Sequence, residues 1–266
     1  MERAMHEIAI YPSVTERVEQ RRGGLRVFDR LVSERTAHIV VDLQNGFMAP
    51  GAVAEIAAAR DIVPTVNRIS AAVRQAGGLV VYIQNTLDAE AIRTWSTYLD
   101  HFCSPSRRER MIEAFTPGAE GHALWSGLDV RPEDLKVRKR RFGAFVAGSS
   151  DLHAMLQERG VDTLIITGTA SQVCCESTAR DAMMLNYKVF FVADGNATFT
   201  DEEHNATLSA MAYTFCDVIT SDALMALIGQ DVASRAPGDA RAETPGNGTP
   251  AMIGTASSKQ REAAVA

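Results

Sequence analysis

The sequence predicts a three-layer α/β/α fold in which helices cover both faces of a mostly parallel, six-stranded sheet. Short apolar runs rich in β-branched residues alternate with segments of helical period. The runs are almost continuously apolar, which is typical of strands buried on both faces of a parallel sheet. In such α/β folds, functional side chains lie at the carboxyl ends of the strands.

Five runs are expected to form buried strands, and a sixth, more polar run is expected at an edge of the sheet. The sixth run covers residues 135–145. Polar and charged residues are commoner on an edge strand, which has one side open to solvent. The five buried strands are expected within residues 37–43, 77–85, 162–168, 188–195 and 217–222.

Three segments between these runs show helix signals. Residues 150–160 begin with the cap-forming Ser150 and end at Gly160. Thr200 and Glu203 have the spacing of a capping box. Apolar side chains recur at helical spacing on one face of the earliest segment, at Ile62, Val66, Ile69 and Val73.

The chain divides into three parts. Residues 1–35 are expected to be an N-terminal extension, and residues 36–231 a single α/β domain. Residues 232–266 are rich in Ala, Gly, Pro, Ser and Thr and lack large apolar residues at any period. We therefore expect a flexible C-terminal tail that contributes nothing to the core.

Composition argues against several classes of protein. The net charge of −6 is opposite to that of a nucleic-acid binder. The N-terminus has no apolar region of the signal-peptide type, and no run approaches the ~20 apolar residues of a membrane span. The four cysteines include no C-x-x-C pair. These features predict a cytoplasmic protein with free thiols and no membrane partner.

The stretch TGTASQVCCEST, residues 167–178, is the main candidate for chemistry. It begins at the carboxyl end of a predicted strand, and residues 174–187 are expected to form the helix that follows. Cys174 then lies at a helix N-terminus, where free N–H groups lower the pKa of a thiol. Cys175 lies about 100° further round the helix and is expected to face the core. The alternative for each cysteine is a small buried hydrophobe.

A nucleophilic cysteine also needs a base. No histidine falls at the carboxyl end of a predicted strand, so Cys–His chemistry is poorly supported. Asp42 does end the first strand, although an Asx turn would also explain it. Residues 136–141 are basic and would usually be solvated. Strand alternation puts Lys139 and Arg141 on one face and Arg138 and Arg140 on the other, so that one basic side chain can turn inward. A lysine between a thiol and a carboxylate stabilises the charge of both or relays a proton between them.

Four motifs in this order carry a resemblance to a known family: VVDLQNGF, KRRFGAF, TGTASQVCCESTARDA and VADGNAT. Over roughly residues 35–230 the chain resembles the isochorismatase-like cysteine hydrolase superfamily. The resemblance implies a Rossmann-like sheet topology and a catalytic triad of Asp42, Lys139 and Cys174. It also implies a cis peptide at Thr169–Ala170, which aims the backbone N–H groups of Ala170 and Cys174 at a substrate carbonyl as an oxyanion hole.

The function implied is hydrolysis of a C–N bond in a small, carboxylate-bearing amide or ureido compound through a thioester, with release of ammonia or an amine. The D-x-H…H metal motif of similar nicotinamidases is absent from residues 84–102, so we expect no metal and no cofactor. The chain looks most like the ureidoacrylate and N-carbamoyl amidohydrolase branch, except that Leu87 replaces a tryptophan. A homodimer or homotetramer is expected by resemblance.

Substrate contacts are expected from polar and aromatic residues near the strand ends. Trp95, Tyr98 and Phe102 are expected to wall the pocket, and the alternative for these aromatics is a place in a helix core. A substrate carboxylate could be held by Arg93, Arg107 or Arg141. The substrate-binding residues predicted are Gln44, Phe47, Asn85, Trp95, Tyr98, Phe142 and Thr169.

Three other functions compete with this one. Isochorismatase-type hydrolysis of a vinyl ether would use Asp42 as a general acid and needs no cysteine nucleophile. A non-catalytic binding module on the same scaffold would leave Cys174 with an ordinary thiol pKa, about 8.5. A nucleotide-binding domain is disfavoured because the sequence has neither G-x-G-x-x-G nor a P-loop.

Overall fold

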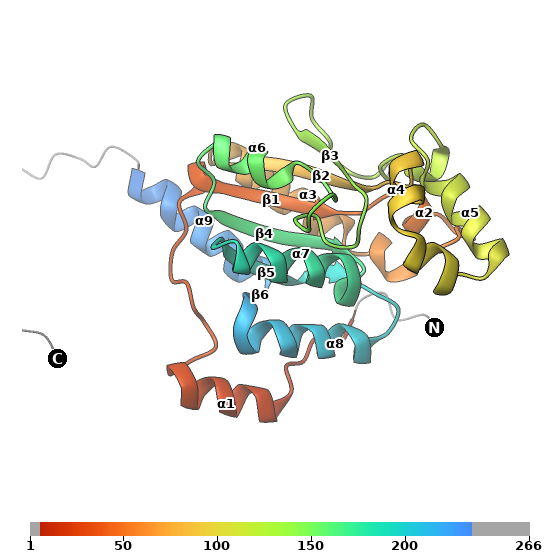
Figure 1. Ribbon diagram of the computed structural model, residues 1–266. Coiled ribbons are helices and arrows are strands. Elements are labelled where there is room, and N and C mark those ends of the chain that lie inside the picture. The colour runs from red at the N-terminus through yellow and green to blue at the C-terminus, as the bar shows by residue number, and fades with distance from the viewer. Residues whose placement is uncertain (1–5, 236–266) are drawn as a thin grey trace, which may run out of the picture. The chain divides into compact units, whose positions relative to one another are not determined.

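A computed structural model describes residues 6–235 and confirms the predicted α/β fold (Figure 1). All six strands are parallel, in the order β3-β2-β1-β4-β5-β6. The sheet is thus wholly rather than mostly parallel, and the polar strand β3 lies at its edge as predicted. The strands are β1 (Thr36–Val41), β2 (Leu79–Asn85), β3 (Leu135–Lys139), β4 (Thr163–Thr169), β5 (Lys188–Ala197) and β6 (Asp217–Ile219).

Helices and helical turns connect the strands. The α-helices are α1 (Pro12–Arg22), α2 (Asn45–Met48), α3 (Val63–Gln75), α4 (Ala89–Thr94), α5 (Pro105–Phe115), α6 (Leu152–Glu158), α7 (Glu176–Met184), α8 (Asp201–Ala210) and α9 (Ser221–Arg235). Short 3₁₀ turns are η1 (Ser33–Arg35), η2 (Ala57–Arg60) and η4 (Glu120–His122), and wider π turns are η3 (Thr97–His101), η5 (Ser171–Cys175) and η6 (Met211–Phe215).

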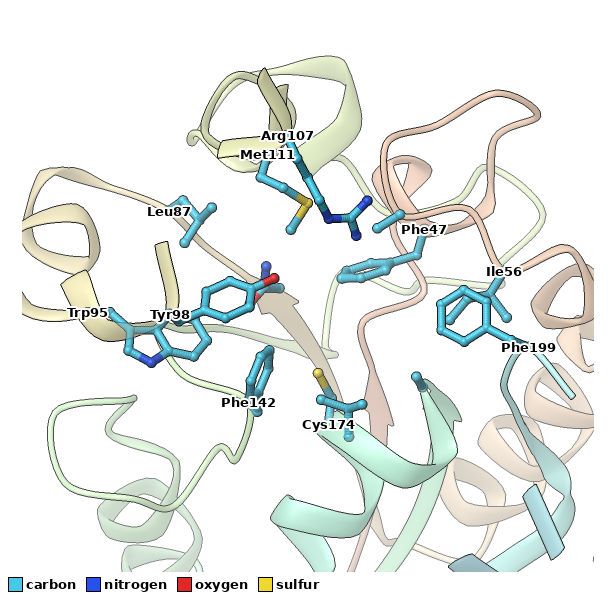
Figure 2. Close-up of a pocket in the computed structure, with 14 residues that line it drawn as sticks. Phe47, Ile56, Leu87, Trp95, Tyr98, Arg107, Met111, Phe142, Cys174 and Phe199 are labelled. Carbon is cyan, nitrogen blue, oxygen red and sulfur yellow. The ribbon is translucent and has the colours of Figure 1, made fainter. Parts of the chain in front are cut away.

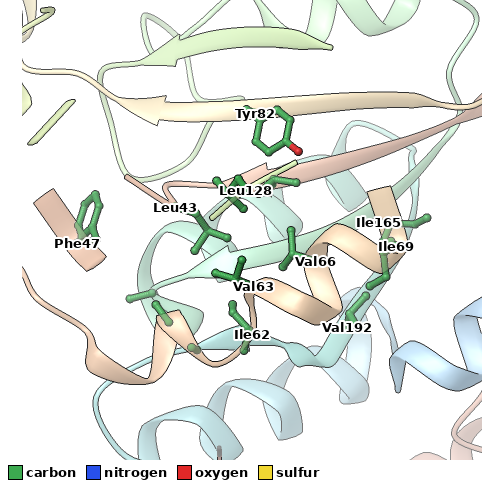
Figure 3. Close-up of a cluster of buried hydrophobic side chains, with 14 of the residues drawn as sticks. Leu43, Phe47, Ile62, Val63, Val66, Ile69, Tyr82, Leu128, Ile165 and Val192 are labelled. Atoms are coloured by element: carbon green, nitrogen blue, oxygen red, sulfur yellow. The ribbon is translucent and has the colours of Figure 1, made fainter. Parts of the chain in front are cut away.

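The core consists of two apolar layers, one on each face of the sheet. Alternate strand residues enter opposite layers, so Val40 belongs to one and Ile39 to the other. Helices α3 and α9 cover the first face, where Val66 and Ile69 pack against the strands (Figure 3). Helices α6, α7 and α8 contribute to the second layer (Figure 1).

The helix signals are largely confirmed. Helix α3 buries the predicted apolar face. Helix α8 is capped by Thr200, whose Oγ1 accepts a hydrogen bond of 3.2 Å from the N–H of Glu203. The helix expected over residues 174–187 is shorter, because Cys174 lies in η5 and α7 stops at Met184. Asn186, with φ 72°, turns the chain away before β5.

Both ends of the described chain contact the domain. Helix α1 lies near η6, where Arg22 Nη2 donates a 2.8 Å hydrogen bond to the carbonyl of Ala212. Helix α9 runs through Arg235, beyond the predicted boundary at 231, and Arg235 pairs with Glu34 at 2.9 Å. The rest of the predicted tail, residues 236–266, lies outside the described residues.

Candidate active site

Three side chains meet at the carboxyl end of the sheet. Asp42 follows β1, Lys139 is the last residue of β3, and Cys174 lies in η5 directly after β4. Lys139 Nζ lies 2.7 Å from Asp42 Oδ2 and 3.5 Å from Cys174 Sγ. We refer to these three residues as the triad, and the structure brings all three together.

Lys139 is held in place by its neighbours as well as by charge. Its side chain is fully buried, while Lys136 and Arg138 on the same strand point to solvent. Strand alternation thus turns one basic residue of the run inward, as predicted. The ammonium group also donates to the Arg141 carbonyl at 3.0 Å and the Asn85 Oδ1 at 3.4 Å.

Asp42 has a left-handed backbone with φ 55°, which aspartate adopts more readily than most residues. Its carbonyl accepts a 2.8 Å hydrogen bond from the N–H of Gln44, and its carboxylate pairs with Lys139. Asp42 therefore ends the strand in a tight turn and also directs a buried carboxylate toward the triad.

The electrostatics of the triad contradict the expected low pKa of the thiol. Burial is the largest influence on Cys174 and raises its pKa to about 12, with the positive charge of Lys139 acting in the opposite direction. Burial also raises the pKa of Asp42, again against the effect of Lys139. Burial lowers the pKa of Lys139, but the charges of Asp42 and Cys174 outweigh it and raise that pKa overall. In the resting site, Cys174 is therefore a thiol next to an ion pair.

The turn that carries Cys174 is held by side chains from distant parts of the sequence. The Thr169–Ala170 peptide bond is cis. Ser171 Oγ lies 2.8 Å from His204 Nδ1, and His204 Nε2 donates to the Ala193 carbonyl at 3.0 Å. Burial lowers the pKa of His204 to about 4, so this histidine is neutral and accepts from Ser171. His6 stacks on it at 4.5 Å. Sequence reasoning missed this network, because the partners are far apart along the chain.

A cavity of about 160 Å³ opens above Cys174 (Figure 2). Five of the predicted substrate-binding residues line it: Phe47, Asn85, Trp95, Tyr98 and Phe142. Leu87 also lines it. Residues that sequence reasoning missed complete the wall, and they are Ala54, Ile56, Met111, Val173 and Phe199.

Two of the predicted substrate-binding residues do not line the cavity. The Gln44 amide instead holds backbone groups, because its Nε2 donates to the carbonyls of Asn85 and His122 and its Oε1 accepts from the N–H of Asn85. The Thr169 hydroxyl donates to the Ala197 carbonyl at 3.0 Å. Phe102 is also absent from the wall, since 77% of it is exposed.

Of the three candidate arginines, only Arg107 lines the cavity. Its Nη1 donates to the carbonyl of Val53 at 2.9 Å, which ties α5 to the chain segment after α2. Arg141 turns away and donates to Thr94, and Arg93 is exposed.

Residues 6–235 hold neither a metal-binding cluster nor a membrane-spanning helix. In this part of the chain no three His, Cys, Asp or Glu side chains gather as ligands for a metal ion. Over the same range, the helices are too short or too polar to cross a bilayer.

Comparison with known proteins shows which family the chain belongs to. Residues 36–223 match the family described as Isochorismatase domain. The chain belongs to the isochorismatase family. Among solved structures of the isochorismatase family and its relatives, a cysteine hydrolase from Pseudomonas syringae superposes with a TM-score of 0.70 at 26% identity, covering 77% of this chain and 98% of that one.

Two curated proteins that are similar to this chain are described as enzymes of different kinds. A probable inactive nicotinamidase of Arabidopsis thaliana is 36% identical over 66% of this chain and 87% of its own length. The ureidoacrylate amidohydrolase RutB of Variovorax paradoxus is 32% identical over 60% of this chain and 67% of its own length.

Proposed function

We propose that this protein is an amidohydrolase that uses Cys174 to cleave the C–N bond of a small amide or ureido compound. The observation that carries the proposal is the geometry of the triad: Cys174 Sγ borders the cavity and lies 3.5 Å from Lys139, which pairs with Asp42. The likeness to an amidohydrolase and to a cysteine hydrolase supports it.

In the proposed reaction, Asp42 accepts the thiol proton as Cys174 Sγ attacks the carbonyl carbon. Ala170 and Cys174 both border the cavity, and in this reaction their backbone N–H groups stabilise the oxyanion that forms. Protonated Asp42 then gives its proton to the leaving nitrogen, and ammonia or an amine departs. Water hydrolyses the thioester, which yields the acid and restores the thiol.

The raised pKa of Cys174 is compatible with this route. A proton that moves from Cys174 to Asp42 leaves the net charge of the triad unchanged, so burial penalises the transfer far less than a separate ionisation. Lys139 stays next to the negative charge on either partner. The nucleophile is thus produced during attack rather than kept as a thiolate.

The alternative is isochorismatase-type hydrolysis of a vinyl ether, with Asp42 as general acid. The raised pKa of Asp42 favours a protonated form that such a step requires. That reaction gives no role to Cys174, however, although its sulfur borders the cavity.

The test is ammonia release from purified protein and its Cys174→Ala variant. The panel contains ureidoacrylate, N-carbamoyl amino acids, maleamate, nicotinamide and aryl amides. We expect release from at least one compound and a loss of about 10³-fold or more in the variant. If neither protein releases ammonia and both consume isochorismate, the amidase proposal is wrong and the Asp42 acid mechanism replaces it.

We also propose that the protein acts in the cytoplasm as a homodimer or homotetramer, without nucleic-acid or membrane partners. The family resemblance supports the assembly, and the net charge of −6 supports the absence of nucleic acid. Sedimentation velocity on the full chain distinguishes these assemblies from a monomer.

A further inference from the structure

We propose that the substrate is a small primary amide with a flat apolar body and a carboxylate remote from the amide, and that Arg107 binds this carboxylate. The inference rests on the proposed amidase function and narrows its substrate class. It follows from the chemistry of the cavity wall, from the position of one arginine and from the hydrogen bonds that the polar side chains near the triad make to backbone groups.

The first observation is that the cavity has aromatic walls. Trp95 and Tyr98 stack with ring centroids 4.6 Å apart, and Phe142 packs edge-on to them at 4.7 and 5.0 Å. Phe47 and Phe199 lie on the other side of the cavity (Figure 2). Such surfaces favour a planar, apolar ligand, because aromatic faces stack and release water from apolar area.

The second observation is that the polar groups expected to bind substrate are already engaged. The amide of Gln44 and the hydroxyl of Thr169 bond to backbone groups. Asn85 does line the cavity, at the triad end, where it can accept or donate to the scissile amide. A ureido compound carries an additional N–H, which would lie against apolar walls at a cost of about 1–3 kcal/mol if unpaired.

The third observation is the single charged side chain in the wall. Arg107 reaches from α5 into the cavity on the side opposite Cys174 (Figure 2). Its Nη1 is fixed by the Val53 carbonyl, which leaves Nε and Nη2 as a pair of parallel donors. Across residues 6–235, no carboxylate pairs with Arg107. A planar fork of this kind matches a carboxylate with two hydrogen bonds.

These observations fix an orientation for the substrate. The scissile amide lies at Cys174 and Asn85, the body lies between the aromatic walls, and the carboxylate lies at Arg107. No Asp or Glu borders the cavity in the described part of the chain, so the carboxylate meets no like charge there. Arg107 is itself exposed, and its free donors can pair with a substrate carboxylate but not with a neutral apolar group, which favours the charged substrate.

The experiment compares amides that differ only in the carboxylate. The pairs are 4-carbamoylbenzoate with benzamide and fumaramate with crotonamide, and ureidoacrylate is the ureido compound. Arg107→Met removes the charge but keeps an apolar side chain of similar length. Arg110→Met is the matched control, because Arg110 is an exposed arginine of the same helix outside this cavity.

We expect the carboxylated amides to have kcat/KM about 10²-fold above their neutral partners. Arg107→Met should raise the KM of the carboxylated amides about 10–100-fold, which is the usual worth of a charge-assisted pair, with little change in kcat or for neutral amides. Arg110→Met should behave as wild type. Equal losses for charged and neutral amides, or a preference for ureidoacrylate, would overturn the inference.

Binding measurements separate this inference from the proposed function. In the Cys174→Ala protein, calorimetry should show tighter binding of 4-carbamoylbenzoate than of benzamide, and Arg107→Met should abolish the difference. If this selectivity is present but no amide is hydrolysed, the amidase function fails while the carboxylate site stands. If amides are hydrolysed in a Cys174-dependent way without this selectivity, only the present inference fails.

Discussion

At the scale of single residues, a fully buried lysine lies between a carboxylate and a thiol. Lys139 opposes the effect of burial on both partners, lowering the pKa of Asp42 and of Cys174 from what burial alone would give. Removing Asp42 or Lys139 would leave the other as a buried charge without its partner, which is strongly destabilising. The three side chains are therefore expected to act as a unit, and their substitutions not to be additive.

The proposed mechanism predicts a bell-shaped dependence of kcat/KM on pH. Asp42 must be ionised to accept the thiol proton, and burial raises its pKa above the ordinary 3.8, so activity falls as the pH drops through that raised value. Lys139 must remain protonated, and its pKa is raised above the ordinary 10.5 by the neighbouring charges, which outweigh burial. The alkaline limb of the profile is therefore expected above pH 10.5.

The measurement is kcat/KM on the best substrate from about pH 4 to about pH 11. The Asp42→Asn variant should lose about 10²–10⁴-fold in rate together with the acidic limb. An acidic limb at or below the ordinary carboxyl pKa in the wild-type protein would contradict the role given to Asp42.

At the scale of elements, β4 aligns the nucleophile with the base. Gly168 pairs with Val41 in the register of β4 and β1, directly before the turn that carries Cys174 and beside the residue that precedes Asp42. It has φ 128°, and a Cβ there would lie 2.1 Å from the carbonyl oxygen of Val41. Only glycine allows the two strand ends to approach this closely.

Gly168→Ala is therefore expected to be severely destabilising. The added methyl group forces the strands apart, and alanine must also adopt a backbone conformation that it rarely populates. Together these effects lower the free energy of unfolding by about 3 kcal/mol or more. Urea unfolding of the two proteins measures this difference.

Gly229→Ala is the control for the substitution itself. Gly229 lies within α9, and a Cβ there meets no atom within 4 Å. Alanine in a helix is favoured over glycine by about 0.5–1 kcal/mol, so this variant should be slightly stabilised. If Gly168→Ala unfolds at the same urea concentration as wild type, the close approach of β1 and β4 is not what requires glycine.

At the scale of the whole molecule, contacts within Met1–Arg235 form one compact unit. Helix α9 is its last element, and its buried residues Leu224, Leu227 and Ile228 join the layer that contains α3. The composition of the residues beyond α9 predicts that they add nothing to the core.

A chain that ends at Arg235 should therefore keep its stability and activity. We expect its Tm to remain within about 2 °C of the full chain, which corresponds to less than about 1 kcal/mol for a domain of this size. A chain that ends at residue 220 is the control and should fail to fold, because it lacks α9. A Tm drop of more than about 5 °C on ending at Arg235 would contradict the prediction.

The sequence by itself predicted the alternation of strands and helices and the edge position of β3, and the motifs that carry the family resemblance pointed to Asp42, Lys139 and Cys174. These features are local: apolar period, residue type at a strand end and motif spacing are all legible along the chain. The same local signals did not show that the side chains of Gln44 and Thr169 bond to backbone groups, since a polar residue near a strand end can face either a cavity or the backbone.

Only the tertiary structure decided which side chains face the cavity and how the triad holds its protons. Hydrogen bonds join Gln44 to His122, Ser171 to His204 and Arg107 to Val53, and the two partners of each bond lie far apart in the sequence. The pKa of Cys174 rises because packing from several elements removes water from the sulfur, and this effect outweighs the positive charge of Lys139. Desolvation is a property of the assembled molecule, so no local pattern could predict it.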